Sequence, residues 1–301
     1  MNDFRLPIGD VAENFVDFIT EVFGPVFDFI RTVFLGAYDA VDWVLSAPPF
    51  WAIIAVIVLL AFFARGWVLA IGTAIGLLLI VGVNQWENAM DTLAMVLVAS
   101  LIAIAISVPL GVLAARSKVA SQIIRPVLDF MQTMPAFVYL IPAIILFRVG
   151  VVPGIVATIV FALAPGVRLT ELGIRGVDRE VVEAGHAFGS SPWRILRQIQ
   201  LPLAFPSIMA GVNQVIMLSL SMVVIAGFVG AGGLGSDVVQ SLQRIDVGLG
   251  FEAGLSVVIL AIILDRVTAS LGGGRRLLRR APRTAKATPA PTPVSSAGNA
   301  R

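Results

Sequence analysis

Residues 183–202 read EAGHAFGSSPWRILRQIQLP, and they form the centre of a polar island about thirty residues long. Arg175, Arg179, Arg194 and Arg197 belong to this island, whereas the segments on both sides are apolar and long enough to cross a bilayer. Charged side chains are costly inside a membrane. The island is therefore predicted to be a loop outside the bilayer, between two membrane spans.

The composition of the whole chain is that of a membrane protein. Hydrophobic residues make up 58% of the 301 residues, charged residues make up only 13%, and the mean hydropathy is +0.94. Soluble domains carry about 25% charged residues. The chain has no Cys and a single His186, so neither a disulfide nor a metal site built from Cys or His is expected. Residues 1–25 lack a basic start and a short apolar core, so no cleavable signal peptide is expected.

Seven apolar runs predict an all-α polytopic membrane protein with about seven transmembrane helices. The first two runs are short and are separated only by Arg65 and Gly66, which indicates a tight helical hairpin. The predicted spans are residues 50–64, 67–83, 92–115, 135–147, 151–167, 205–228 and 248–271.

We divide the chain into four parts: an acidic N-terminal extension (1–48), the hairpin (49–91), a core (92–272) and a basic tail rich in Pro and Ala that is expected to be disordered (273–301). The extension carries eight acidic and two basic residues. Its spacing predicts an amphipathic helix that ends before Pro25. This helix either lies along the membrane interface or packs against the protein's own helices, and interfacial helices are usually basic.

Basic residues follow the third, fifth and seventh predicted spans, and these three regions fall on one side of the membrane. That side is cytoplasmic by the positive-inside rule, so the N-terminus is expected outside and the C-terminus in the cytoplasm. The basic tail serves either as an orientation signal or as a site for anionic lipid. The residues are Arg116, Lys118, Arg125, Arg168, Arg175, Arg179, Arg194, Arg197, Arg275, Arg276, Arg279, Arg280 and Arg283.

A short helix is predicted within the island, because residues 190–192 (Ser-Ser-Pro) can cap it and start it. Trp193 and Ile195 are then candidate apolar anchors for a partner, and Arg194 and Arg197 give charge complementarity. The alternative is an ordinary basic cytoplasmic loop.

Two other patterns bear on chemistry. Residues 230–235 read GAGGLG, which matches a dinucleotide-binding pattern, but such a site needs a preceding strand and here a membrane span precedes it. The glycines instead predict a tight turn at the outer face. The chain has no G-x-x-x-x-G-K-[ST] sequence and no paired carboxylates or Ser/His/Asp set placed for catalysis. It is therefore predicted not to be an enzyme.

Polar residues within predicted spans are costly, which makes them candidates for a substrate path. Such residues can also simply bond neighbouring helices. The candidates are Gln132, Thr133, Pro135, Asn213, Gln214, Ser219 and Ser221.

The polar island resembles the cytoplasmic EAA loop of ABC importer permeases, whose pattern is E-A-A, three residues, Gly, nine residues, I-x-L-P. One position departs, because Gly185 stands where the pattern has Ala. The residues in register are Glu183, Ala184, Gly189, Ile199, Leu201 and Pro202.

Residues 92–272 resemble one branch of these permeases, that of the glycine betaine/proline betaine importers, most closely in residues 132–142, 205–214 and 219–226. The resemblance implies the type I ABC importer permease fold, the bacterial inner membrane as location, and ATPase coupling through the island. The implied coupling residues are Glu183, Ala184, Gly185, Gly189, Ser191, Pro192, Trp193, Arg194, Ile199, Leu201 and Pro202.

The resemblance also implies three protein partners in addition to membrane lipid. They are a cytoplasmic ABC ATPase that holds ATP and Mg²⁺, an extracytoplasmic substrate-binding protein, and a second permease copy. The implied substrate is a quaternary ammonium osmolyte of the glycine betaine, proline betaine or choline class, and neither a cofactor nor a nucleic acid is expected on this chain. The alternatives are a methionine or phosphonate importer permease, an ion-coupled secondary transporter, and a receptor or assembly protein without ATPase coupling.

Overall fold

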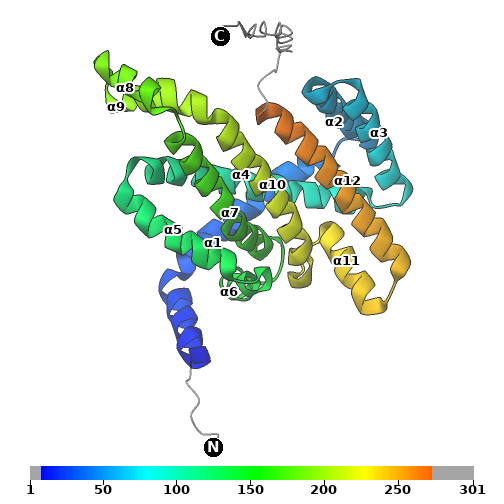
Figure 1. The fold of residues 1–301 in the computed structure, drawn as a ribbon. Helices are drawn as coiled ribbons and strands as arrows, with labels where there is room; N and C mark the ends of the chain where they lie inside the picture. Colours follow the sequence, from blue (N-terminus) through cyan, green and yellow to red (C-terminus); the bar gives the residue numbers. More distant parts are fainter. Residues whose placement is uncertain (1–7, 273–301) are drawn as a thin grey trace, which may run out of the picture.

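A computed structural model describes residues 8–272, and all regular elements within that range are helices (Figure 1). The elements are α1 (Ile8–Ser46), α2 (Phe50–Arg65), α3 (Trp67–Gly82), α4 (Trp86–Arg116), α5 (Lys118–Thr133), the short 3-10 helix η1 (Ala136–Tyr139), α6 (Leu140–Phe147), α7 (Val151–Arg175), α8 (Arg179–Ala187), α9 (Pro192–Ile195), the π-helical turn η2 (Leu196–Gln200), α10 (Leu201–Ala226), η3 (Gly227–Val229), α11 (Gly233–Arg244) and α12 (Val247–Gly272). The all-α fold predicted from the sequence is confirmed.

Four helical stretches within residues 8–272 are long and apolar enough to cross a membrane, namely Trp86–Arg116, Val151–Arg175, Pro192–Val229 and Val247–Gly272. Two further apolar stretches, α1 with α2 and α5 with α6, bend by 99° and 107° at a short break. The number of spans is therefore four, or up to six if each bent pair counts as one. The prediction of seven separate crossings is wrong.

Residues 135–147 do not form a span of their own. With eight residues, α6 is about 12 Å long, whereas the hydrocarbon core is about 30 Å thick. Met134 is extended because Pro135 follows it, and this breaks the helix between α5 and η1. The Tyr139 hydroxyl donates a hydrogen bond to the Met131 carbonyl across the break. The bend is therefore determined by Pro135 and stabilised by this hydrogen bond.

The N-terminal helix also differs from the prediction, because α1 continues through Pro25 to Ser46. A proline inside a helix removes one backbone hydrogen bond. The second half of α1 packs through Phe34, Tyr38 and Val41 against the buried residues of α4 and α7. This tertiary packing compensates for the lost bond, which the local sequence does not reveal.

The core of the molecule lies between α4, α7 and α10, which pass one another at the centre of Figure 1. One buried cluster joins Met95 of α4 to Leu220 and Met222 of α10. Beside this core lie α2 and α3, which are joined by Gly66 alone. Gly66 has a φ of +83°. These two helices pack against α12 and the start of α4 through Leu77, Ile80 and their neighbours.

The glycines of residues 230–235 form the turn between η3 and α11, with Gly230, Gly232 and Gly233 at positive φ. A Cβ at Gly227 would lie 2.3 Å from the backbone of Gly235, so the two segments touch backbone to backbone. The Leu234 amide donates to the Thr92 hydroxyl at 2.8 Å, which ties the turn to α4.

The polar island and the glycine turn lie at opposite ends of the bundle. Figure 1 shows α8 and α9 protruding at the upper end, whereas α11 lies at the lower end. The basic tail, with its five arginines between residues 275 and 283, lies outside the described residues. The division at residues 48, 91 and 272 remains a prediction.

Candidate functional site

The polar island folds into two short helices that stand on the ends of α7 and α10. Asp178 caps α8 by accepting a hydrogen bond from the Glu180 amide at 3.0 Å. Ser191 caps α9 by accepting from the Arg194 amide at 3.4 Å, and Pro192 follows in the first turn. Between the two helices, Gly189 turns the chain with a φ of +75°. The structure therefore has the short helix where the sequence predicts it.

The packing between α8 and the following turn accounts for the position that departs from the EAA pattern. Gly185 is buried, and a Cβ there would lie 2.9 Å from Cδ1 of Ile199 and 3.3 Å from Cγ1 of Ile195. In this chain the methyl end of Ile199 occupies the space that an alanine side chain would need. An alanine at this position would therefore require the Ile199 and Ile195 side chains to shift.

Five residues of π-helix, Leu196–Gln200, connect α9 to α10. Leu196 is buried in a cluster with Ile174 of α7 and Ala204 of α10, whereas Ile195 is buried beside Gly185 of α8. The loop is therefore seated on the ends of two core helices through apolar contacts, and it does not stand free.

We call the contact of the loop with the ends of α7 and α10 its seat. The side chains of the loop that point away from this seat are apolar as well as charged. Phe188 is 89% exposed and Trp193 is 60% exposed, and Trp193 lies under the guanidinium of Arg116 at 5.9 Å. The prediction that Ile195 is an outward anchor is wrong, because Ile195 is only 2% exposed and lies against Gly185 of α8. Phe188, which the sequence reading did not select, takes that place. Exposed aromatic side chains beside arginines are the usual anchors of protein interfaces.

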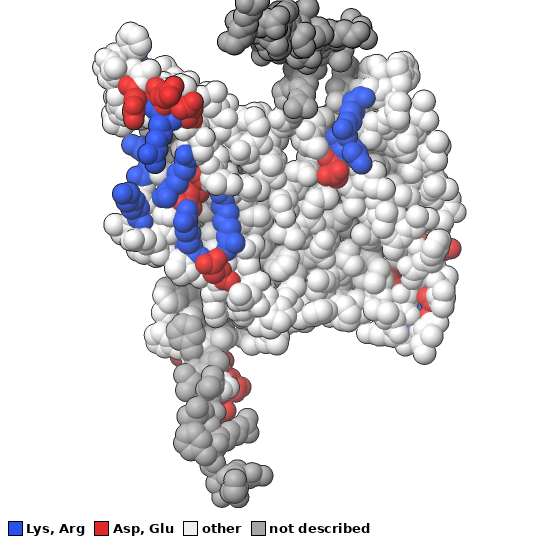
Figure 2. Space-filling view, viewed as in Figure 1, with Lys and Arg blue, Asp and Glu red and all other residues white. Residues whose placement is uncertain are grey.

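The remaining residues of the loop divide between the outward face and the seat. In Figure 2, acidic atoms gather near the tip of the loop and basic atoms lie below them. Ile199 and Leu201 are half-buried at the seat. The exposed members of the predicted coupling set are Glu183, Ala184, Gly189, Ser191, Pro192, Trp193, Arg194 and Pro202.

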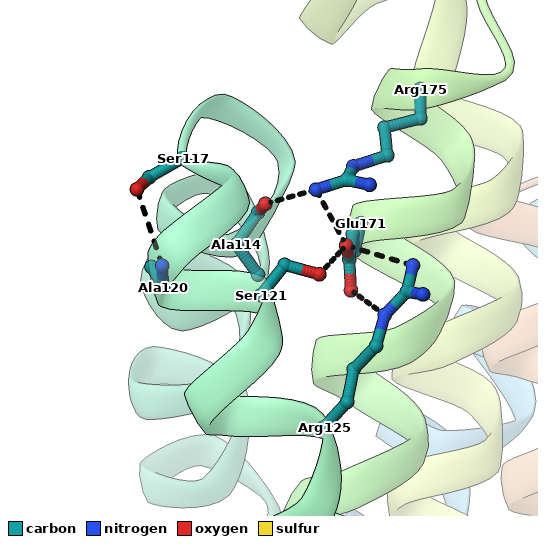
Figure 3. A network of polar contacts seen from close by, with 7 residues as sticks. All are labelled: Ala114, Ser117, Ala120, Ser121, Arg125, Glu171 and Arg175. Atoms are coloured by element: carbon teal, nitrogen blue, oxygen red, sulfur yellow. Dashed lines mark hydrogen bonds and ion pairs between the residues drawn. The ribbon is translucent and has the colours of Figure 1, made fainter.

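Below the loop, one buried carboxylate joins three helices (Figure 3). Glu171 of α7 is 3% exposed, and it accepts hydrogen bonds from the Ser121 hydroxyl at 2.8 Å and from Arg125 Nη2 at 3.0 Å, both on α5. Arg175 lies 3.1 Å from the same carboxylate and also donates to the Ala114 carbonyl near the end of α4 at 2.8 Å. We call these residues the Glu171 network. The network joins the end of α4, the first half of α5 and the end of α7. Arg175, its last residue, lies four positions before α8 begins.

The sequence reading missed Glu171 because the predicted span ended at residue 167. The helix continues to Arg175, so Glu171 is an ionisable residue in the last turns of a membrane helix. Such a residue is a functional candidate by default. A second pair, Arg168 and Asp129, joins α7 and α5 beside it, but both of these side chains are largely exposed.

The predicted path residues fall into two groups. Gln132, Thr133 and Pro135 are exposed at the bend between α5 and η1, and Gln214 and Ser221 are exposed along one face of α10. The bend and the end of α10 are linked by the rings of Phe137 and Phe228, whose centroids are 5.3 Å apart.

The other two path candidates point inward. The Asn213 amide donates to Asp265 of α12 at 3.0 Å, and its oxygen accepts a hydrogen bond from Thr268. Ser219 is fully buried, and its hydroxyl has no hydrogen-bond partner within residues 8–272. In this conformation Asn213 therefore bonds α10 to α12.

Comparison with known families places this architecture. Residues 107–276 match the family described as binding-protein-dependent transport system inner membrane component. The chain is 48% identical to the glycine betaine/carnitine transport permease protein GbuB of Listeria monocytogenes (serotype 1/2a, strain 10403S), over 87% of this chain and 94% of that protein. It is 44% identical to the glycine betaine transport system permease protein OpuAB of Bacillus subtilis (strain 168), over 89% and 95%. The glycine betaine/proline betaine transport system permease protein ProW of Escherichia coli (strain K12) is 45% identical over 90% and 77%.

Among solved structures, the chain is similar to a subunit of the MetNI methionine ABC transporter in inward-facing conformations. One crystal form of that transporter aligns with a TM-score of 0.58 at 23% identity, covering 62% of this chain and 94% of that chain. A second form aligns with a TM-score of 0.56 at 22% identity, covering 60% and 91%. At this identity the likeness concerns the fold alone.

Proposed function

Since this chain belongs to the family of binding-protein-dependent transport system inner membrane components, we propose that it is the permease subunit of an ATP-driven importer for quaternary ammonium osmolytes. Its curated relatives, at 44–48% identity and nearly full length, are permease proteins whose names include glycine betaine. The observation that carries the coupling part is the loop of α8 and α9, which is seated on two core helices and presents Phe188 and Trp193 outward.

ATP and Mg²⁺ bind on a separate cytoplasmic ATPase, and this chain holds no cofactor. Phe188 and Trp193 enter a groove of that ATPase as apolar anchors, and Arg194 contacts its rim. When the two ATPase subunits close on ATP, the loop moves as a unit with the ends of α7 and α10, because Leu196 is buried between those helices. The loop then faces the cytoplasm, and α11 faces the outside.

A second permease copy covers the exposed polar face of α10. Ala210, Gln214, Ser221 and Phe228 are all exposed, at successive spacings of four, seven and seven residues, so they share one helix face. Neither the Gln214 nor the Gln132 side-chain amide makes a hydrogen bond within residues 8–272, and a side-chain amide facing lipid would lack a partner. Between two copies, these amides line a polar path through which the substrate passes after delivery by an extracytoplasmic binding protein.

The test is ATP-dependent uptake of labelled glycine betaine into vesicles that contain this chain with its ATPase and binding protein. Unlabelled proline betaine, choline, methionine and proline serve as competitors. We expect competition from the quaternary ammonium compounds only. Competition by methionine alone would indicate a methionine importer permease instead. Uptake without ATP would refute the importer mechanism.

The coupling loop is tested separately with Glu183→Arg, which reverses one exposed charge on α8. We expect normal amounts of the variant in the membrane but little uptake, because the charge complementarity with the ATPase is lost. Full uptake by the variant at normal expression would contradict the coupling role.

A further inference from the structure

A groove of about 480 Å³ runs between α3 and α12, on the side of the molecule away from α5 and α7. Its walls are apolar, with Val68 of α3 and Ile262 of α12 exposed at its edges. Its volume is within the range of small-molecule sites, and its walls belong to helices that face the bilayer.

Two glycines of α3 shape this groove. At Gly76 the helices touch, because a Cβ there would lie 2.8 Å from Ile259 of α12. One turn earlier, at Gly72, no atom lies within 4 Å of the position that a Cβ would take. Thr73 forms the floor between them with 1% exposure, and its hydroxyl has no hydrogen-bond partner among the residues that the structure describes.

The mouth of the groove is basic. Arg65, at the α2–α3 junction, and Arg266 of α12 both line it and both are exposed. Asp265 lies 3.8 Å from Arg266 and also accepts a hydrogen bond from Asn213. Its single negative charge balances only one of the two arginines, so the mouth keeps one positive charge in excess. Figure 2 shows a group of basic side chains at the upper right, with an acidic group beside it.

This mouth lies at the same end of the bundle as the coupling loop. A Cβ at Gly272, the last residue of α12, would lie 2.6 Å from Met209, eight residues after α10 begins. The end of α12 is therefore beside the start of α10, which follows the loop. Arg266 is six residues from that end, at the depth where arginine side chains reach the headgroup region of a membrane.

We propose that the groove is a binding site for a phospholipid with an anionic headgroup, taken from the leaflet on the side of the coupling loop. An acyl chain lies along Gly72 and Thr73 between α3 and α12, and the phosphate lies between Arg65 and Arg266. Arginine guanidinium groups suit phosphate oxygens in charge and geometry. Apolar walls below a basic mouth match a lipid, whereas a free phosphate would leave the groove itself unfilled.

The test is lipid titration of the purified full-length chain with its ATPase in detergent, with bound lipid counted by native mass spectrometry. Dioleoylphosphatidylglycerol is the anionic probe and dioleoylphosphatidylcholine the zwitterionic one. At about 1 kcal/mol per arginine, Arg65→Gln or Arg266→Gln weakens binding of the anionic probe about fivefold, and the double variant weakens it about thirtyfold. Arg244→Gln, at the opposite end on α11, leaves binding unchanged.

Gly72→Leu tests the groove independently of charge. The leucine side chain enters open space, so the helix keeps its fold while the acyl chain loses its position, and binding of both lipids to this site is lost. Gly82→Leu on the same helix, also without an atom within 4 Å, is the matched control and keeps binding.

Four results would overturn the proposal. The first is unchanged affinity for the anionic probe in the double arginine variant, and the second is an equal effect of Gly72→Leu and Gly82→Leu. The third is displacement of the lipid by inorganic phosphate alone, and the fourth is loss of a second permease copy instead of lipid in Gly72→Leu. None of these measurements depends on uptake, so the lipid site and the proposed transport function can fail separately.

Discussion

Replacing Glu171 by Gln keeps the shape of the side chain but removes the charge that holds the Glu171 network together. Breaking a fully buried ion pair costs about 3–5 kcal/mol, whereas an exposed pair is worth at most about 1 kcal/mol. The Glu171 side chain is 4% exposed, but those of Arg125 and Arg175 are 56% and 36% exposed, so both arginines keep part of their hydration after the change. We therefore expect Glu171→Gln to destabilise the fold by about 2 kcal/mol.

The change should also loosen α5 from α7, and α5 leads to the bend at Pro135. Two measurements follow on the purified transporter: thermal unfolding in detergent, and uptake per ATP hydrolysed after reconstitution. The expected Tm is lower by about 4–8 °C, and uptake per ATP falls while ATP hydrolysis continues.

Asp129→Asn is the matched control for this experiment, because it makes the same chemical change in the neighbouring pair with Arg168. Both side chains of that pair are largely exposed, at 65% and 41%. Its Tm should stay within about 2 °C of the unchanged protein. If Glu171→Gln is as stable and as well coupled as Asp129→Asn, the reasoning from burial is refuted.

Three further experiments probe the loop and the path. Phe188→Ala and Trp193→Ala should each lower the affinity for the ATPase about tenfold, as expected for central aromatic anchors, and undiminished co-purification of the ATPase with the solubilised permease would speak against the anchors. Gly189→Val should reduce uptake strongly, because a φ of +75° costs a branched residue about 1–2 kcal/mol although no atom blocks its Cβ. Gly189→Asn should retain more uptake, because asparagine tolerates this backbone conformation better. Less uptake in Gly189→Asn than in Gly189→Val would exclude backbone strain as the cause. Asn213→Leu should lower the Tm by about 2–4 °C through the lost bond to Asp265 without changing the KM for substrate, whereas a raised KM at an unchanged Tm would place Asn213 on the path.

The sequence was most informative where a pattern is local. The spans at α4, α7, α10 and α12 follow from long apolar runs, and the cap at Ser191 follows from residue types beside a helix start. The resemblance of the polar island to the EAA loop identified the family, which the match to residues 107–276 confirms.

What the sequence could not provide depends on contacts between distant segments. Pro25 reads as a helix end, and only the packing of α1 on α4 and α7 shows why the helix continues. Ile195 and Trp193 look equivalent as apolar residues of the loop, yet Ile195 is buried beside Gly185 of α8 whereas Trp193 is exposed. Hydropathy alone gives no orientation to such a pair.

The π-helical turn Leu196–Gln200 has a consequence for the helical phase of the coupling loop. A π turn holds one residue more than the α-helix that it interrupts, and each residue of an α-helix advances the helix by about 100°. Deleting a single residue there would restore a regular helix into α10 while rotating α9 by about that angle relative to the membrane. Phe188 and Trp193 would then face another direction, although every other residue of the loop were retained. The direction in which the loop presents its side chains thus depends on the number of residues in the connecting turn as much as on which side chains they are.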